Sequence, residues 1–155
     1  RFVARNLGVE VLTQVENHHN FAWLEEHDGE RLVIHRKGAT PAHEGVLGVI
    51  PGSMATPGYV VRGKGAPEAL CSASHGAGRQ LSRTAATARY TASDALEFLR
   101  KRQVRVLSAG VDEVPMAYKD IEEVMEAQRD LVTPIARFNH KLVKMAPSGR
   151  KSIKM

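Results

Sequence analysis

The adjacent pair His18-His19 is the first place in this chain where the residue types could do chemistry, and five more histidines follow it up to residue 140. Neutral imidazole is a good ligand for divalent first-row metals. Neighbouring side chains on an extended segment point in opposite directions, so only one of the two can easily face a given ion. The pair therefore indicates either one metal ligand or two hydrogen-bonded histidines with a structural role.

Another histidine, His75, lies in a segment of small residues, Ser72-Ala73-Ser74-His75-Gly76-Ala77-Gly78-Arg79. Its two glycines would let backbone N–H groups approach an anion closely. A helix that began at Gly78 would add the favourable dipole of its N-terminus. His75 would then lie where a nucleophilic or metal-bound imidazole touches a phosphate. The alternative is a glycine-rich turn in which the histidine is incidental.

Further short segments carry residues suited to phosphates or nucleotides. Three basic side chains in His35-Arg36-Lys37-Gly38 could bind phosphate or form a solvated strand edge. Tyr118 could stack on a base, and Lys144 could pair with a nucleotide or extend into solvent. Pro51-Gly52-Ser53-Met54 is typical of a tight turn. The formal charge of +5 and the pI near 9.6 favour phosphate-bearing partners.

The composition is that of one ordinary globular domain of 155 residues, with 43% hydrophobic and 25% charged residues. Apolar runs are too short to cross a bilayer, and we expect no signal peptide. The single cysteine, Cys71, excludes an internal disulfide and a cysteine-rich zinc site. It fits a reducing compartment, so we expect a cytoplasmic location.

The elements that must position these residues follow from periodicity and turn signals. Helices are predicted over residues 1–16, over 78–90, from Ser93 or Asp94 to Leu99, and over 119–132. Strands are predicted over residues 21–26, 31–35, 46–50, 59–61, 104–107 and 142–145, the first two joined in a hairpin by Asp28-Gly29. Residues 149–155 suggest a basic, poorly ordered tail. The mixture without strict alternation predicts an α+β or irregular α/β fold.

Five motifs occur in a fixed order: Asn-His-His-Asn-Phe-Ala (17–22), His-Arg-Lys-Gly-Ala-Thr (35–40), Pro-Gly-Ser-Met (51–54), Ser-His-Gly-Ala-Gly-Arg (74–79) and Ala-Tyr-Lys-Asp-Ile (117–121). On these motifs the chain closely resembles the C-terminal part of the RtcB family of GTP- and manganese-dependent RNA-splicing ligases. The resemblance runs from about Arg1 to Met145. It implies an α+β, mixed-sheet fold in which residues 1–146 are the C-terminal part of the catalytic domain and residues 147–155 are a basic tail.

The resemblance implies a reaction. In the family a histidine attacks GTP and becomes guanylylated, the GMP passes to an RNA 3′-phosphate, and a 5′-hydroxyl then attacks the activated end and releases GMP. A 2′,3′-cyclic phosphate end is first opened by the same enzyme. The implied partners are RNA with such ends, in tRNA splicing or RNA repair, and the activating protein archease. No membrane is expected among the partners.

The resemblance also assigns roles to residues. His75 matches the guanylylated histidine, a nucleophile that must be unprotonated and oriented, and His19 matches a manganese ligand. Positions that contact the nucleotide match Ser53, Ala77, Gly78, Tyr118 and Lys144. Positions associated with RNA phosphates match Lys37 and Arg83. His35 and Arg36 remain open between phosphate contact and support of the strand end, and no role falls to His27, His43 or His140.

The sequence lacks the family's other metal-ligand motifs, which are Asp-x-x-Cys, Gly-Asn-His-Phe-x-Glu and a histidine motif near His-Ser-Gly-Ser-Arg. Cys71 does not substitute, because it lies outside the Asp-x-x-Cys context. We therefore expect an incomplete ligase, the C-terminal part of a longer protein. One alternative is a non-catalytic RNA- or nucleotide-binding relative, and another is a hydrolase that uses metal-bound water.

A second departure lies in the turn after Pro51. The chain has Met-Ala-Thr-Pro-Gly-Tyr over residues 54–59 where the family usually has Met-Gly-Thr-x-Ser-Tyr. We expect Ala55 to restrict the turn backbone. Gly58 lacks a hydroxyl that would hydrogen-bond the nucleotide, a loss on the order of 1 kcal/mol.

Overall fold

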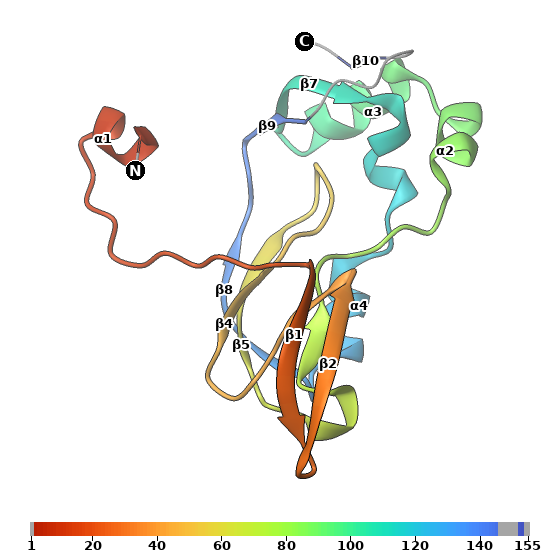
Figure 1. Cartoon of the computed structure of the whole chain (residues 1–155). Coiled ribbons are helices and arrows are strands. Elements are labelled where there is room, and N and C mark those ends of the chain that lie inside the picture. Colours follow the sequence, from red (N-terminus) through yellow and green to blue (C-terminus); the bar gives the residue numbers. More distant parts are fainter. Residues whose placement is uncertain (1, 146–151, 154–155) are drawn as a thin grey trace.

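The computed structural model describes residues 2–145 and 152–153. Its helices are α1 (Phe2–Leu7), α2 (Arg83–Arg89), α3 (Ala92–Lys101) and α4 (Ile121–Ala127), with 3-10 turns η1 (Pro67–Ala69), η2 (Val111–Glu113) and η3 (Pro115–Ala117). Its strands are β1 (Asn20–His27), β2 (Glu30–Lys37), β3 (Ala39–Pro41), β4 (Leu47–Ile50), β5 (Gly58–Gly63), β6 (Ser72–Ser74), β7 (Arg105–Gly110), β8 (Val132–Phe138), β9 (Leu142–Lys144) and β10 (Ser152–Ile153) (Figure 1). This arrangement confirms the α+β class.

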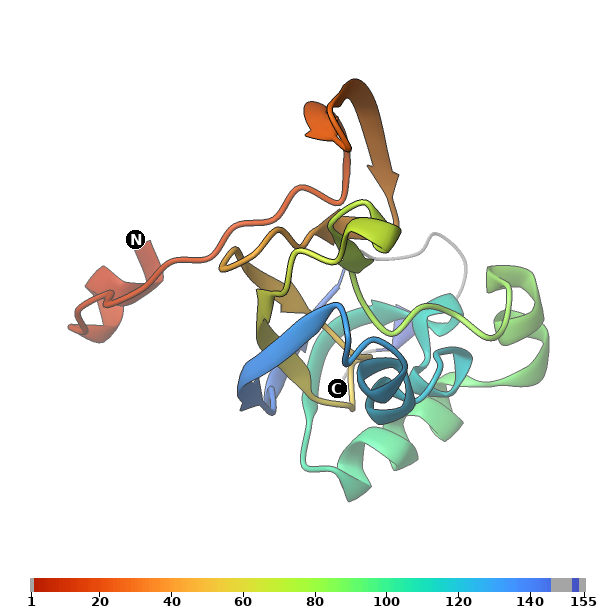
Figure 2. The same cartoon turned by 90° about the horizontal axis from the view of Figure 1, so that it is seen from below.

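Strands β1 and β2 form the predicted antiparallel hairpin, with Asn20 opposite Lys37 and His27 opposite Glu30. Asp28 and Gly29 have φ angles of 52° and 80°. Two successive positive φ angles define the turn whose twist matches a hairpin, which is why the Asp-Gly pair predicted it. The hairpin projects from the body of the molecule in both views (Figures 1 and 2).

A three-stranded antiparallel sheet, in the order β4-β5-β8, forms one part of the body together with helix α4 (Figure 1). The buried residues of this part of the body are called the α4 core here, and they include residues near β3 and β6: Ala42, Ile50, Tyr59, Val61, Ala73, Ala77, Ile121, Met125 and Val132. The short pair β3-β6 belongs to the same core and leads directly into His75.

A second part of the body combines helices α2 and α3 with a sheet in the order β10-β7-β9. Strands β7 and β9 run parallel, whereas β10 is antiparallel to β7. The buried residues here make up the α3 core: Met54, Ala86, Ala95, Leu99, Val104, Val106, Ala109, Val111, Val114, Ala117 and Ile153. The two cores meet where the loop after β4 and the loop after β6 cross from one to the other.

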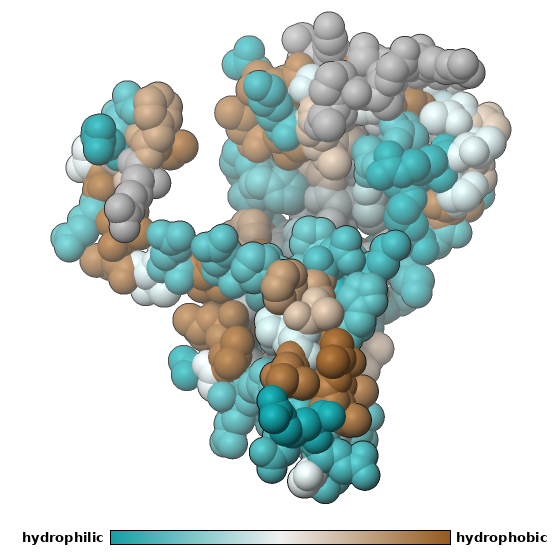
Figure 3. Space-filling view, in the orientation of Figure 1, coloured by the Kyte–Doolittle hydropathy of each residue, from teal (hydrophilic) through white to brown (hydrophobic). Residues whose placement is uncertain are grey.

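The predicted helix over residues 1–16 was wrong beyond its first turns. Helix α1 ends at Leu7, and none of its residues is buried. A six-residue helix without a packing partner has little to offset the cost of nucleation, so the apolar spacing alone does not extend it. The segment that follows is an extended arm that joins α1 to β1 (Figure 1), and apolar side chains are exposed along it (Figure 3). Among them Leu12 is 87% exposed.

The predicted helix over residues 78–90 begins later, at Arg83, with Ser82 as its N-cap. Residues 78–81 instead lie beside residues 117–119, because Gln80 and Leu81 both donate backbone N–H groups to Ala117, and Lys119 donates to Gly78. The expected helix dipole at Gly78 is therefore absent. Tertiary pairing outweighed the helix propensity of this segment.

Two other helix boundaries differ from the prediction. Helix α3 is capped by Thr91, not by Ser93 or Asp94; Asp94 completes a capping box with Thr91. Helix α4 ends at Ala127, and Val132, which was predicted to lie in this helix, begins strand β8 instead. This strand was not predicted. In the part of the chain that the structure describes, no helix has the length and apolar character of a membrane span.

The predicted C-terminal tail lies mostly outside the described residues, as does the boundary expected after residue 146. Ser152 and Ile153 are the exception, since they form β10 on the edge of β7, and Ile153 is fully buried. For these two residues the expectation of a poorly ordered segment was wrong.

Candidate functional site

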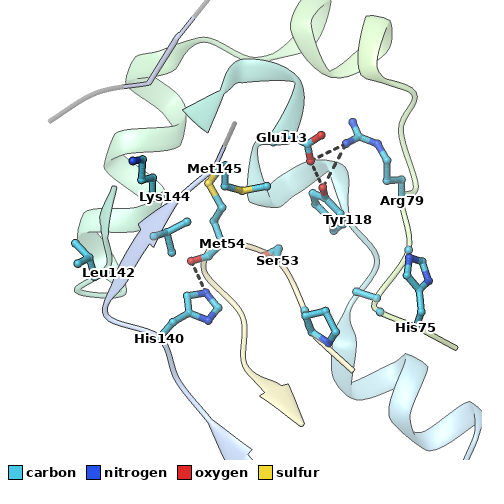
Figure 4. A pocket seen from close by; sticks show the side chains of 16 residues that line it. Ser53, Met54, His75, Arg79, Glu113, Tyr118, His140, Leu142, Lys144 and Met145 are labelled. Carbon is cyan, nitrogen blue, oxygen red and sulfur yellow. Dashed lines mark hydrogen bonds and ion pairs between the residues drawn. The ribbon is translucent and has the colours of Figure 1, made fainter. Parts of the chain in front are cut away.

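A cavity of about 690 Å³ lies where the two cores meet (Figure 4). Its walls come from the loop after β4, the loop after β6, the turns η2 and η3, and the segment that ends in β9. The residues that line it are Pro51, Gly52, Ser53, Met54, His75, Gly76, Ala77, Gly78, Arg79, Glu113, Tyr118, His140, Leu142, Val143, Lys144 and Met145. His75 and all five predicted nucleotide-contacting residues are among them.

His75 follows β6 directly, and its backbone N–H donates to the carbonyl of Gly38. Its imidazole stacks on that of His19, with ring centroids 5.2 Å apart and planes 18° apart. The Nδ1 atom is buried and has no hydrogen-bond partner among the described residues. A buried polar atom without a partner is costly, and the described residues supply no partner to Nδ1 of His75.

The loop around His75 is not an open cradle of N–H groups, as its glycines suggested. The backbone N–H groups of residues 75, 76 and 77 donate within the protein, to Gly38 O, Ser74 Oγ and Pro51 O. Gly78 has a φ of +72°, a conformation that favours glycine. This glycine turns the chain from the cavity wall toward Tyr118. The N–H groups of residues 75–77 are therefore bonded within the protein, which favours the alternative of a glycine-rich turn at this point.

Ser53 is almost fully buried at the cavity wall. Its Oγ accepts hydrogen bonds from the Ala55 N–H at 3.3 Å and from Thr56 Oγ1 at 3.0 Å. A hydroxyl has one proton to donate and two lone pairs. Since both bonds use the lone pairs, the Ser53 proton is left to donate toward the cavity.

Tyr118 contributes an aromatic wall, and its hydroxyl donates a hydrogen bond to the buried Glu113. Arg79 stacks over the Tyr118 ring at 5.2 Å and pairs with Glu113 at 3.3 Å. Burial and the hydrogen bond to Glu113 raise the pKa of Tyr118 to about 12, so the phenol is neutral at physiological pH. The ring, and not the hydroxyl, is therefore what Tyr118 offers to a ligand.

The opposite side of the cavity carries Lys144 from β9, which Figure 4 places across from His75. Near it, His140 makes a 2.7 Å hydrogen bond between Nε2 and the carbonyl of Met54. This bond ties the segment before β9 to the loop that holds Ser53. The sequence analysis gave His140 no role, and an isolated histidine in a polar loop carried no signal for one.

The described residues do not make up a manganese site. His19 lies beside His75, as the resemblance requires, but no cluster of three or more histidine, cysteine, aspartate or glutamate side chains occurs among residues 2–145 and 152–153. A structural or catalytic metal normally needs at least three protein ligands. His19 is thus a single candidate ligand.

Lys37 and Arg36, adjacent in β2, face opposite sides of the hairpin. Lys37 is exposed at the end of the strand, as expected for a residue that contacts RNA phosphate. Arg36 is only 2% exposed, and its guanidinium donates to both carboxylate oxygens of Glu25, to Ser72 Oγ and to the carbonyl of Leu70. Of the two roles left open for Arg36, the structure supports the structural one.

Glu25 is the centre of a polar cluster that the sequence analysis missed. Arg36, His27 and His43 all direct nitrogens at its carboxylate, at 2.6, 2.9 and 3.3 Å. Hydrogen bonds from Arg36 foremost, and from the two histidines, lower the pKa of Glu25 to about 2 against the opposing effect of burial. The cluster fastens the hairpin to the segment after β3. Its members come from β1, β2 and the segment after β3, so no single local motif reveals it.

Arg83 lies outside the cavity, at the start of α2. Its guanidinium pairs with Asp112 at 2.6 Å and with Glu113 at 2.7 Å, although the side chain is 68% exposed. The charge that was expected to meet an RNA phosphate is therefore shared with two buried carboxylates.

The two departures from the family turn have structural explanations. Ala55 has no positive φ angle, so its side chain causes no strain in this turn. Gly58 does not line the cavity; a Cβ atom there would lie 2.4 Å from Cζ of Phe138. The aromatic ring occupies the space that a serine side chain would need.

Comparison with known proteins assigns the class of the molecule. The family model described as tRNA-splicing ligase RtcB matches residues 2–145. The chain therefore belongs to the RtcB family.

Relatives in several organisms carry that name. The chain is 44% identical to the RNA-splicing ligase RtcB of Escherichia coli K12 over 125 residues, which cover 81% of this chain and 31% of the relative. It is 38% identical to the tRNA-splicing ligase RtcB of Nanoarchaeum equitans (81% and 31%) and 37% identical to that of Methanococcus maripaludis (94% and 34%). The chain thus spans about a third of the length of these three relatives.

Proposed function

We propose that this chain carries the nucleotide-accepting part of a GTP-dependent RNA ligase, with His75 as the nucleophile. One observation carries the proposal: a single cavity brings His75 together with Ser53, Ala77, Gly78, Tyr118 and Lys144. These residues come from four separate segments. Their convergence is what a site for one nucleotide requires.

In the proposed reaction an unprotonated nitrogen of His75 attacks the α-phosphorus of GTP. The N–P bond forms as the bond from that phosphorus to the β-phosphate oxygen breaks, and pyrophosphate leaves. The GMP is then passed to an RNA 3′-phosphate, and attack by a 5′-hydroxyl releases it. Opening of a 2′,3′-cyclic phosphate end, in tRNA splicing or RNA repair, precedes this sequence.

The other residues bind and orient in this proposal. The free proton of Ser53 and the cation of Lys144 contact the nucleotide, the Tyr118 ring packs against it, and Ala77 and Gly78 form the wall beside His75. Lys37 and Arg83 contact RNA phosphates. We assign His19 as one manganese ligand, and a bound ion would offset the charge of the triphosphate. The proposed partners are RNA with such ends and archease.

The test is the intact mass of the protein as isolated from its source, before and after incubation with GTP and Mn²⁺. We expect the gain of one GMP, mapped by peptide sequencing to His75, and no gain with ATP. An unmodified mass under conditions in which GTP binds would contradict the proposal.

One observation favours a second function, a non-catalytic nucleotide- or RNA-binding relative. Among the described residues His19 is the only side chain assigned to the metal, while the cavity for the nucleotide is present. GTP or RNA binding without any adduct would support this second function.

A further inference from the structure

We propose that Gln128 is a positioning residue for His75, an inference that rests on the function proposed above. Gln128 is the polar residue that interrupts the apolar face of α4 and its continuation. It is only 5% exposed, although a buried amide is costly unless its polar atoms are bonded. It does not line the cavity, so any effect on the reaction must act through another residue.

The contact that matters is with the residue before His75. Gln128 Oε1 accepts a hydrogen bond from the backbone N–H of Ser74 at 3.0 Å. Along a strand, successive N–H groups point to opposite edges. The His75 N–H points to the carbonyl of Gly38, the residue just before β3. The Ser74 N–H therefore points away from β3, to the other edge of β6. The β3-β6 sheet has two strands, and the side chain of Gln128 takes the place of a third.

Ser74 in turn holds both sides of the His75 backbone. Its Oγ donates to the Gly76 carbonyl at 2.5 Å and accepts the Gly76 N–H at 3.4 Å. The side chain of residue 74 therefore closes a small ring across residue 75. Fixing the backbone of Ser74 fixes the direction from which the His75 imidazole enters the cavity.

Gln128 is itself held rigidly. Its side-chain Nε2 donates to the sulfur of Met125 at 3.5 Å. Its backbone carbonyl accepts hydrogen bonds from the N–H groups of Leu131 and Val132. Met125 and Val132 belong to the α4 core. The side-chain oxygen of Gln128 therefore fixes the position of the His75 imidazole relative to the α4 core.

Gln128→Leu removes the side-chain oxygen that accepts the Ser74 N–H, while the volume of the side chain stays nearly the same. The Ser74 N–H becomes buried and unpaired, and the loop shifts to find water. We expect the single-turnover rate of GMP transfer to His75 to fall about tenfold, since small displacements of a nucleophile cost rate. The affinity for GTP should stay within about twofold, because no cavity residue is changed. Gln128→Glu keeps an acceptor oxygen and should restore most of the rate.

The experiment measures adduct formation by quenched-flow and mass spectrometry, and GTP affinity by calorimetry, for the native-length protein and three variants. Met125→Leu is the matched control, because it removes the sulfur contact in the same core but keeps the bond to Ser74. A slow Gln128→Leu with normal Gln128→Glu and Met125→Leu supports the proposal. Equal rates in all four proteins, or equal slowing in Gln128→Leu and Met125→Leu, overturn it. If the unmodified protein forms no adduct, the proposed function itself fails.

Discussion

The two sides of the His75 imidazole are built very differently. On one side lies a cavity of about 690 Å³ whose wall comes from both hydrophobic cores. On the other side lies the end of a two-stranded hairpin, which stacks His19 on the ring, places Gly38 beside it and leaves Lys37 in solvent. Four segments line the cavity side, and three of them contribute buried residues. The hairpin side depends on one polar cluster around Glu25.

This difference shows which parts of the proposed site the described residues can preorganise. A nucleotide pocket needs apolar walls and a few fixed polar groups, and two adjoining cores supply both. A site for a divalent ion needs several charged or imidazole ligands at one point, and the described residues bring one. The cavity side should therefore resist most single substitutions, whereas the hairpin side should respond strongly to the loss of its cluster.

The largest expected effect is on the cavity side and concerns chemistry alone. His75→Ala should abolish the GMP adduct, because a single imidazole carries the transferred group. The melting temperature should change by about 2 °C or less, since no hydrogen bond of the imidazole ring is lost. Mass spectrometry and calorimetric melting measure the two effects. Survival of the adduct would remove His75 from its role, and His35→Ala on the exposed face of the hairpin serves as control.

The next effect tests the hairpin side through Glu25. Glu25→Gln leaves the buried Arg36 without its carboxylate, and we expect a loss of about 2 kcal/mol in the free energy of unfolding at pH 7. Because the folded-state pKa of Glu25 is about 2, below its ordinary value of 4.5, this stabilisation is complete above pH 4.5 and is lost as the pH falls toward 2.

Urea denaturation of both proteins at pH 7 and pH 3 measures this difference. The two curves should lie further apart at pH 7 than at pH 3. The matched control is Glu26→Gln, an exposed carboxylate on the other face of the same strand, which should change stability little. A gap that stays constant between the two pH values would show that the Glu25 charge is not the source.

A smaller effect separates the two residues assigned to RNA phosphates. Lys37→Ala removes an exposed cation, so the slope of log affinity against log salt should decrease by about 0.7 to 0.9. Arg83→Ala should weaken RNA binding and decrease the slope by less, because its charge is already shared with Asp112 and Glu113. Filter binding at several salt concentrations gives both slopes. Equal decreases would mean that the two ion pairs of Arg83 open when RNA binds.

The smallest effect concerns the turn that departs from the family pattern. Gly58→Ser should lower stability by about 1 kcal/mol, because the new Cβ displaces the Phe138 ring, which is 41% exposed and free to turn outward. It should not improve GTP affinity, since residue 58 does not line the cavity. Thermal melting and calorimetric titration measure the two effects; a gain in affinity would place this residue in the nucleotide site.

Local signals in the sequence predicted local structure well. Asp28-Gly29 specified the hairpin turn, and the strand over residues 142–145 was found as β9. The family motifs contain four of the five predicted nucleotide contacts, and the cavity brings these four together with Lys144.

Interactions between distant segments were what the sequence could not indicate. The helix expected at Gly78 gave way to pairing with residues 117–119, and β8 followed a helix whose apolar pattern continued past its end. The cluster around Glu25 joins residues of three segments. Nothing in the periodicity of a single segment reports such contacts, because their energy depends on the packing of the whole chain.

The shared wall of the cavity has a thermodynamic consequence for the whole domain. Met54, Tyr118, Val143 and Met145 belong to or pack against the α3 core, whereas Ala77 belongs to the α4 core. A ligand that touches both cores binds only when both cores are folded. Its binding free energy then stabilises the two cores as one unit. Filling the cavity should therefore stabilise both cores together and raise the melting temperature of the domain.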